Sequence, residues 1–288
     1  MTDPKLIAGL SEVAPNYDAV LCDIWGVVHN GRTRHQTACE ALLRFRAERG
    51  PVVLISNAPR PSAAVITQLD SLGVPREAWT SVVTSGDATR AALSERAPGP
   101  VWVIGPERDK PLFEGIALDY AGPEDARFIC CTGLIDDHVE TAEDYRERLR
   151  APAARGLEMI CANPDRVVQI GDRLVPCAGA VADVYEELGG TVVMEGKPFS
   201  PIYDLAIAAA VEATGGSLAR DRVLCIGDGI ATDVAGANRQ DLPLLFVAEG
   251  IHGLELAGPD GELDPALAAA RLGRENARAD YLSAALAW

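Results

Sequence analysis

Three aspartates and one lysine lie in short motifs at or shortly after the ends of apolar segments of the chain. Asp23 follows one apolar run, and Asp228 lies in a Gly-Asp-Gly sequence directly after another. Asp233 lies about one helical turn further on, and Lys197, in a Gly-Lys-Pro sequence, lies between Asp23 and Asp228 along the chain. Ionised carboxylates are seldom buried without a partner. This set therefore predicts a bound cation or a catalytic task.

Phosphoryl transfer through an aspartate would use each of these groups. A carboxylate such as Asp23 can act as a nucleophile and form an acyl-phosphate that water then releases. Its approach to an anionic phosphate needs a divalent cation, and Mg²⁺ prefers oxygen ligands such as those of Asp23, Asp228 and Asp233. Lys197 is the charged donor suited to the phosphoryl oxygens. We therefore expect a magnesium site next to a phosphate site.

A hydroxyl and an amide extend this set. Ser56 and Asn57 follow an apolar run, and a hydroxyl, an amide and a loop backbone all suit phosphate. Taken singly, these residues have ordinary interpretations: Asp23 as a helix cap, Ser56-Asn57 as a turn, Lys197 as a solvated loop residue. The order in which they follow one another favours the catalytic interpretation.

The elements that must position these residues alternate along the chain. Short apolar runs predict strands, and segments of helical periodicity between them predict helices. The expected strands are 19–23, 51–55, 81–83, 101–104, 128–131, 158–161, 191–193, 222–226 and 243–247. The expected helices are 35–49, 61–72, 86–95, 140–150, 178–188, 200–213, 231–238 and 276–287. Such alternation predicts an α/β fold with parallel sheets.

A change in composition suggests a second domain. Residues 106–176 are richer in Pro, Gly and Arg than the flanking parts, and 167–175 predicts a hairpin around Gly171-Asp172. A second α/β unit inserted into a first would explain both observations.

The overall composition of the chain limits the classes of function that it can have. The 288 residues contain 48% hydrophobic and 24% charged residues, as in an ordinary globular protein. The net charge of −16 argues against nucleic acid polymers and anionic membranes as partners. Seven cysteines form no CxxC pair, and the first ten residues show no secretory signal, so we expect reduced thiols and a cytoplasmic location.

The motifs resemble those of the haloacid dehalogenase (HAD) superfamily, specifically its class IIA branch of sugar-phosphate, nucleotide and pyridoxal-phosphate phosphatases. Asp23, Ser56-Asn57, Lys197 and Asp228 with Asp233 match its four motifs in order. Further matching segments are Gly26-Val27, Asn30-Gly31, Thr84–Ala88 and Asn163-Pro164-Asp165.

The resemblance implies a fold, a cofactor and roles. It implies a Rossmann-like parallel-sheet core (1–85 and 188–288) with an inserted α/β cap (86–187) that closes over the substrate, near Asn163 to Asp165. The resemblance further implies that Asp23, the backbone carbonyl of Trp25, Asp228 and Asp233 would hold Mg²⁺. It implies that Ser56, Asn57 and Lys197 would hold the phosphoryl group of a small phosphorylated metabolite, with Asp23 and Lys197 as the catalytic residues. Homodimers occur in the family.

Trp25 departs from the pattern. Phosphatases of this superfamily carry an acid–base aspartate two residues after the nucleophile, and an indole cannot transfer a proton at neutral pH. Three interpretations stay open: a phosphatase with a substitute acid, for which His29 is the nearest candidate; a catalytically impaired, phosphate-ligand-binding or regulatory protein; and a dehalogenase, ranked last because the metal-binding aspartates are present. Hydrolysis of a small phosphomonoester through an aspartyl-phosphate is the function we expect.

Overall fold

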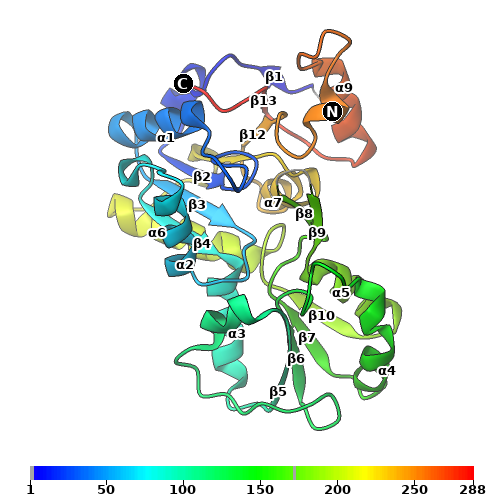
Figure 1. Ribbon diagram of the computed structural model, residues 1–288. Coiled ribbons are helices and arrows are strands. Elements are labelled where there is room, and N and C mark those ends of the chain that lie inside the picture. Colours follow the sequence, from blue (N-terminus) through cyan, green and yellow to red (C-terminus); the bar gives the residue numbers. More distant parts are fainter. Residues whose placement is uncertain (1–2, 171–172) are drawn as a thin grey trace. The chain divides into compact units, whose positions relative to one another are not determined.

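The chain divides into two compact units. The computed structural model describes residues 3–170 and 173–288, so the predicted Gly171-Asp172 turn lies outside the described residues. Unit 1 contains the chain up to Ser56, Ile66–Val83 and Tyr203–Trp288, and unit 2 contains Asn57–Val65 and Thr84–Ile202. Figure 1 shows both units and labels many of their helices and strands.

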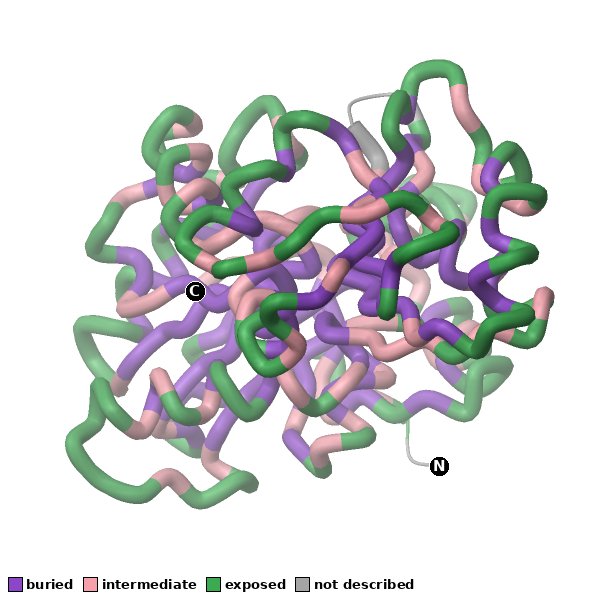
Figure 2. Tube along the Cα trace, turned by 90° about the horizontal axis from the view of Figure 1, so that it is seen from below, coloured by how far each residue is buried: buried purple, intermediate pink, exposed green. Residues whose placement is uncertain are grey.

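Unit 1 is built on a seven-stranded sheet. Its strand order is β1-β13-β12-β11-β2-β3-β4. The bounds are Lys5–Leu6 (β1), Tyr281–Ser283 (β13), Leu244–Val247 (β12), Val223–Gly227 (β11), Ala19–Asp23 (β2), Val52–Ser56 (β3) and Ser81–Thr84 (β4). Every residue of β2, β3, β11 and β12 is buried, as expected for parallel strands covered on both faces. Figure 2 maps this burial along the trace.

Helices accompany these strands along the chain. They are α1 (Gln36–Glu48), α2 (Ser62–Ser71), α6 (Ser200–Thr214), a π-helical turn η7 (Ile230–Val234), α7 (Ala235–Arg239), α8 (Gly253–Leu256) and α9 (Pro265–Arg274). Short 3₁₀ turns are η1 (Leu10–Glu12), η2 (Ala14–Asn16), η3 (Arg76–Ala78) and η6 (Arg220–Arg222). In α1, Ala38, Leu42 and Phe45 recur at helical spacing and are buried, so burial of one apolar face explains this helix.

Unit 2 is built on a four-stranded parallel sheet in the order β10-β7-β6-β5. Its strands are Thr191–Met194 (β10), Glu158–Cys161 (β7), Phe128–Cys131 (β6) and Val101–Ile104 (β5). Strand β8 (Val167–Ile170) pairs in antiparallel fashion with β9 (Arg173–Pro176). The helices are α3 (Ser85–Arg96), α4 (Arg146–Ala154) and α5 (Ala178–Glu187), with 3₁₀ turns η4 (Glu107–Phe113) and η5 (Ala142–Tyr145).

Two hydrophobic clusters cover the faces of this smaller sheet. Ile129 and Cys131 of β6 belong to one cluster, whereas Phe128 and Cys130 belong to the other. Successive strand residues point to opposite faces, so both faces of the sheet are packed. The parallel sheets and their helices confirm the predicted α/β class.

The C-terminal prediction was wrong. Instead of a helix over 276–287, the chain forms β13, which pairs in parallel with β12. Asn276 has a left-handed backbone (φ 51°), which is incompatible with a helix starting there. The last long helix is α9, whose N-cap Asp264 accepts hydrogen bonds from the backbone N–H groups of Ala266 and Leu267. Asp-Pro at 264–265 was the signal for this start.

The limits of unit 2 differ from the cap range of 86–187 expected from the sequence. Strand β10 lies beyond 187 and pairs with β7, so the sheet of unit 2 needs residues up to at least Met194. Residues 57–65 also belong to unit 2. Among the described residues, no helix has the length and apolar character needed to cross a bilayer.

Candidate active site

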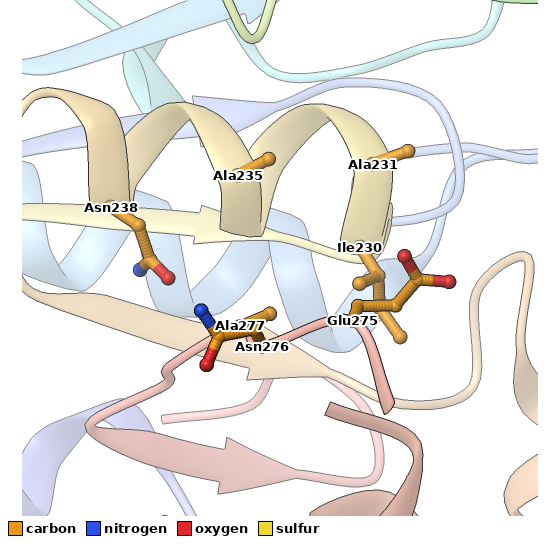
Figure 3. Close-up of a pocket in the computed structure, with 7 residues that line it drawn as sticks. All are labelled: Ile230, Ala231, Ala235, Asn238, Glu275, Asn276 and Ala277. Carbon is orange, nitrogen blue, oxygen red and sulfur yellow. The ribbon is translucent and has the colours of Figure 1, made fainter. Parts of the chain in front are cut away.

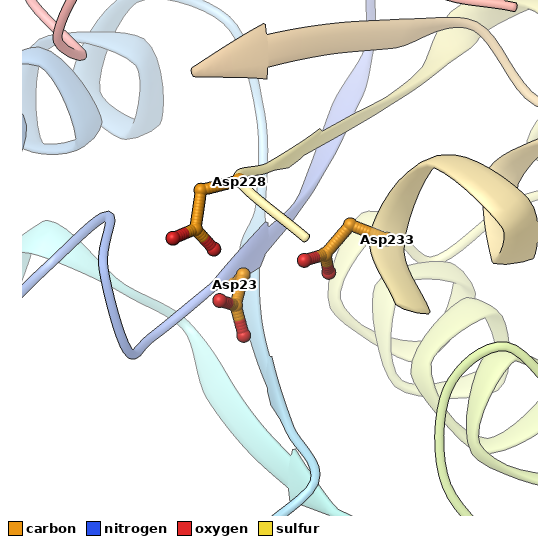
Figure 4. Close-up of side chains that lie close together, drawn as sticks. All are labelled: Asp23, Asp228 and Asp233. Atoms are coloured by element: carbon orange, nitrogen blue, oxygen red, sulfur yellow. The ribbon is translucent and has the colours of Figure 1, made fainter. Parts of the chain in front are cut away.

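Three buried carboxylates meet at one edge of the sheet in unit 1. Asp23, Asp228 and Asp233 each offer an oxygen that lies within 4.8 Å of the others. These residues are 6%, 6% and 4% exposed. Figure 4 shows their side chains turned toward one another, from β2, from the loop after β11 and from the following helical turn. We call these three residues the aspartate cluster.

Strand register explains why two of these residues meet. Ile226 of β11 lies opposite Cys22 of β2, so Asp23 and Asp228 both follow at the carboxyl ends of neighbouring strands. On the other side of β2, Asp23 lies opposite Ile55, which places buried Ser56 at the same edge. Ligands of open α/β sheets bind at this edge.

Asp233 reaches the cluster because of the π-helical turn. The Gly229 carbonyl accepts hydrogen bonds from the N–H groups of Asp233 and Val234 at 2.8 and 3.0 Å. The second bond spans five residues, which defines a π-turn, and such turns recur at functional sites. The Asp233 carboxylate in turn accepts the Gly229 N–H at 3.0 Å. Asp233 is thereby fixed to the loop that carries Asp228.

Asp228 is held by two loops. Its Oδ2 accepts the N–H of Ile251 at 2.7 Å. Gly26, at φ 83°, approaches the same carboxylate so closely that a Cβ there would overlap it. Sequence reasoning missed the Ile251 contact, because a backbone donor in a loop has no residue-type signal.

The aspartate cluster fits a hard divalent cation. Two unit charges within 4.8 Å repel by about 3 kcal/mol or more at an effective dielectric constant of 20. The donors are carboxylate oxygens, which suit Mg²⁺ or Ca²⁺ better than softer metals. Such a cation would offset the repulsion between these carboxylates, and these residues could hold it.

A second cluster lies in unit 2. The Asn57 Oδ1 accepts the backbone N–H of Lys197 at 2.7 Å, and the Asn57 Nδ2 donates to the Lys197 carbonyl at 3.1 Å. The same Nδ2 donates to Asp165 Oδ1 at 2.8 Å. We call Asn57, Asp165 and Lys197 the lysine clamp. The sequence analysis assigned Asn57 and Lys197 to the same phosphoryl group, and it did not assign Asp165 to this site.

Trp25 and His29 pack against each other, a few residues after Asp23 in the chain. Their rings meet edge to face with centroids 4.8 Å apart. Gly31 lies against the indole, since a Cβ at this position (φ 85°) would lie 2.5 Å from Trp25 Cζ3. The indole therefore has a fixed place that depends on glycine at position 31.

His29 is a buried neutral imidazole. Its Nδ1 accepts the Gly31 N–H at 2.9 Å. Nε2 is buried and has no hydrogen-bond partner within the described part of the chain. Burial, with a smaller contribution from His35, lowers the pKa of His29 to about 4. At pH 7 His29 therefore carries no imidazolium proton to donate to a leaving group.

One pocket in unit 1 lies beside the η7–α7 segment. It is lined by Ile230, Ala231, Ala235, Asn238, Glu275, Asn276 and Ala277, which Figure 3 shows between the helical segment and the loop before β13. None of the aspartate cluster lines it. We therefore assign the chemistry to the aspartate cluster and not to this pocket.

Known proteins resemble this chain over most of its length. Residues 20–118 match the family described as haloacid dehalogenase-like hydrolase, and residues 194–273 match a HAD-hydrolase-like family. A crystal structure of a haloacid dehalogenase-like hydrolase from Brucella suis is 42% identical, with a TM-score of 0.86 over 98% of this chain and 100% of that one.

Two characterised relatives are more distant. 5'-Nucleotidase YutF of Bacillus subtilis is 25% identical over 82% of this chain and 88% of its own length. D-Glycerol 3-phosphate phosphatase of Mycobacterium tuberculosis is 27% identical over 84% of this chain and 66% of its own.

The matched segments contain residues of both clusters. The first includes Asp23, Ser56 and Asn57, and the second includes Lys197, Asp228 and Asp233. This agreement confirms the resemblance predicted from the motifs. The chain therefore belongs to the haloacid dehalogenase-like hydrolases.

Proposed function

We propose that this hydrolase cleaves small phosphomonoesters through an aspartyl-phosphate on Asp23. The observation that carries the proposal is the aspartate cluster, with three buried carboxylate oxygens within 4.8 Å at the carboxyl edge of a parallel sheet. A nucleophilic carboxylate beside two potential metal ligands is the arrangement that such chemistry requires. The relatives named as a nucleotidase and a glycerol-phosphate phosphatase support the same reaction class.

Asp23, Asp228, Asp233 and the backbone carbonyl of Trp25 would hold Mg²⁺. When bound, this ion neutralises charge between Asp23 and the phosphate and orients both. The protein's own contribution is to hold the carboxylates in place. Asp233 accepts a hydrogen bond from the Gly229 N–H, and Asp228 accepts one from the Ile251 N–H. Because these bonds preorganise the ligands, little rearrangement is needed during the reaction.

Ser56, Asn57 and Lys197 would bind the transferring phosphoryl group. The Ser56 hydroxyl and the Lys197 ammonium are the donors, and Lys197 supplies positive charge in a chain with a net charge of −16. The amide of Asn57 is engaged with Lys197 and Asp165. We therefore expect Asn57 to contact the phosphate through its backbone N–H.

We propose a nucleotide or a sugar phosphate as the substrate class, acted on by a cytoplasmic enzyme. All seven cysteines are buried thiols, which favours a reducing compartment. A homodimer is also proposed, by analogy with the family, and light scattering after size-exclusion chromatography tests it.

The second candidate function is a phosphate-ligand-binding or regulatory protein with impaired turnover. Trp25 favours it, since the indole occupies a fixed place against His29 and Gly31 and cannot transfer a proton. Loss of a general acid–base typically lowers a rate by about 10²–10⁴-fold. His29 is the nearest candidate for a substitute acid, but a pKa of about 4 leaves it neutral at pH 7.

The first experiment is Mg²⁺-dependent release of inorganic phosphate from a phosphomonoester panel. We expect turnover that Asp23→Asn reduces by about 10⁴-fold or more and that Asp70→Asn leaves unchanged, since Asp70 pairs with Arg76 on the surface of unit 1. Mg²⁺ binding without turnover on any substrate would favour the binding protein.

Trp25→Asp separates the two candidates further. A carboxylate at position 25 should raise kcat by about 10²-fold if proton transfer limits the enzyme. The melting temperature is expected to fall, because the change removes packing against His29 and Gly31. An unchanged kcat in a folded variant would show that another group already transfers the proton, and His29→Ala would then be the next variant.

A further inference from the structure

The backbone of Lys197 is bound by a side chain far away in sequence. The amide of Asn57, 140 residues earlier in the chain, bonds both the N–H and the carbonyl of Lys197. Asn57 is 5% exposed and Lys197 is 3% exposed. Water therefore cannot readily replace these bonds, and their loss would leave buried polar groups unsatisfied.

Asp165 fixes which way the Asn57 amide faces. The Nδ2 group donates to two acceptors, the Lys197 carbonyl and Asp165 Oδ1, while Oδ1 accepts the Lys197 N–H. A flipped amide would direct its oxygen at two acceptors and its NH₂ group at a donor. Only one orientation satisfies all three contacts, and the carboxylate of Asp165 strengthens the preference for it.

Gly196, the residue before Lys197, is tightly packed. A Cβ on Gly196 would lie 2.5 Å from Asn57 Oδ1, 2.7 Å from Pro164 Cδ and 2.8 Å from Ser85 Oγ. The chain thus passes directly against Asn57, so a side chain larger than glycine at position 196 would displace the clamp.

The segment that carries Asn57 is itself braced by the start of α3. Thr84 Oγ1 donates to the Arg60 carbonyl at 2.7 Å, and Gly86 N–H donates to the Ala58 carbonyl at 3.1 Å. Asp87 accepts the Ser62 N–H at 3.0 Å and completes a capping box with Thr84. Thr84–Ala88, one of the segments that match the family motifs, therefore has a structural role in unit 2.

We propose that Asn57 and Asp165 are positioning residues that set the place of the Lys197 ammonium by binding the Lys197 backbone. This inference rests on the proposed function, in which Lys197 holds the phosphoryl group. A shift of about 1 Å in such a group can lower a rate by about 10²-fold. The side chains of Asn57 and Asp165 therefore act on the reaction through Lys197.

The isosteric change Asn57→Asp tests the clamp. It removes the Nδ2 donor and places a carboxylate against the Lys197 carbonyl and Asp165. We expect kcat to fall about 10²-fold with a smaller change in KM. Adding Asp165→Asn supplies a donor to the new carboxylate at position 57 and should recover at least about tenfold of the lost rate. The matched control is Asn238→Asp in unit 1, because Asn238 makes the same pair of bonds with the Arg278 backbone and should leave kcat unchanged.

A double-mutant cycle distinguishes positioning from a general structural role. In a Lys197→Ala background, Asn57→Asp should cost less than about twofold further, because the group it positions is gone. An equal loss in both backgrounds would overturn the proposal. A folded Asn57→Asp variant with the kcat of the wild-type protein would also overturn the proposal.

Lysine-selective ¹⁵N labelling tests the contact without relying on turnover. The chain has three lysines, Lys5, Lys110 and Lys197, so three backbone amide signals are expected. In Asn57→Asp the Lys197 signal should shift and exchange faster with D₂O, while those of exposed Lys5 and Lys110 stay. An unmoved Lys197 signal would refute the clamp. A wild-type protein without phosphatase activity, but with this shift in the variant, would instead refute the proposed function alone.

Discussion

In the aspartate cluster three side chains are held by neighbouring strand ends and one helical turn, whereas in the lysine clamp one backbone unit is held by side chains from distant segments. Asp23 and Asp228 are aligned by the pairing of β2 with β11. Lys197 is held by Asn57, 140 residues away. Regular backbone pairing thus fixes the first, and three specific side-chain hydrogen bonds fix the second.

The difference predicts how each region responds to change. The sheet that positions the aspartate cluster is made of fully buried strands, so a single carboxylate can be altered without loss of the scaffold. Lys197 lies outside the helices and strands, between β10 and α6, so its position depends on the hydrogen bonds of the clamp. Small steric changes near Lys197 should therefore affect activity more than comparable changes elsewhere in unit 2.

Metal removal should have the largest effect and act on the aspartate cluster. Chelation is expected to lower activity by about 10³-fold, since a catalytic ion contributes several kcal/mol. Mg²⁺ at about 100 times its Kd should raise the free energy of unfolding by about 2.7 kcal/mol. Denaturation with and without Mg²⁺ measures this. Asp233→Asn should weaken the stabilisation by Mg²⁺, whereas Asp70→Asn should leave it unchanged. Equal stabilisation of both variants by Mg²⁺ would contradict a metal site at the aspartate cluster.

Gly196→Ala should disturb the clamp alone. The added methyl would overlap Asn57, Pro164 and Ser85, so we expect kcat/KM to fall about 10–10²-fold and stability to fall by about 1–3 kcal/mol. Gly122→Ala is the control in the same unit, because a Cβ there meets no atom within 4 Å. Steady-state kinetics and thermal melts decide the outcome. Equal behaviour of the two variants would show that the clamp tolerates displacement.

A smaller effect is expected from His29, on the pH dependence of the stability of unit 1. Its pKa of about 4 in the folded protein lies below the unfolded value of about 6.5, so protons bind the unfolded chain first as pH falls. Stability should therefore drop by about 2 kcal/mol between pH 7 and pH 5 from this group. His29→Asn keeps an acceptor for the Gly31 N–H without titrating. Urea denaturation at both pH values should show a smaller drop for this variant; an identical drop would assign the effect elsewhere.

Much of the fold could be predicted because buried parallel strands are continuous apolar runs. The aspartate cluster followed from the same reasoning, since strand ends of a parallel sheet share one edge. The C-terminal strand could not be read, because β13 has three residues and its pairing with β12 is a tertiary property. The sequence analysis expected the segment Asn163 to Asp165 near the substrate, but it did not predict Asp165 as part of the clamp, because the hydrogen bond from the Asn57 side chain depends on side-chain placement that no sequence pattern specifies.

The packing of Trp25 with His29 and Gly31 constrains how this chain can evolve. A carboxylate at position 25 alone would leave the His29 ring without its edge-to-face partner and the surface of Gly31 uncovered. Restoring an acid–base residue at position 25 would therefore lower stability even where it raises activity, because the packing of the indole against His29 and Gly31 is lost. The protein would have to gain activity at the expense of stability, and this opposition favours keeping the indole.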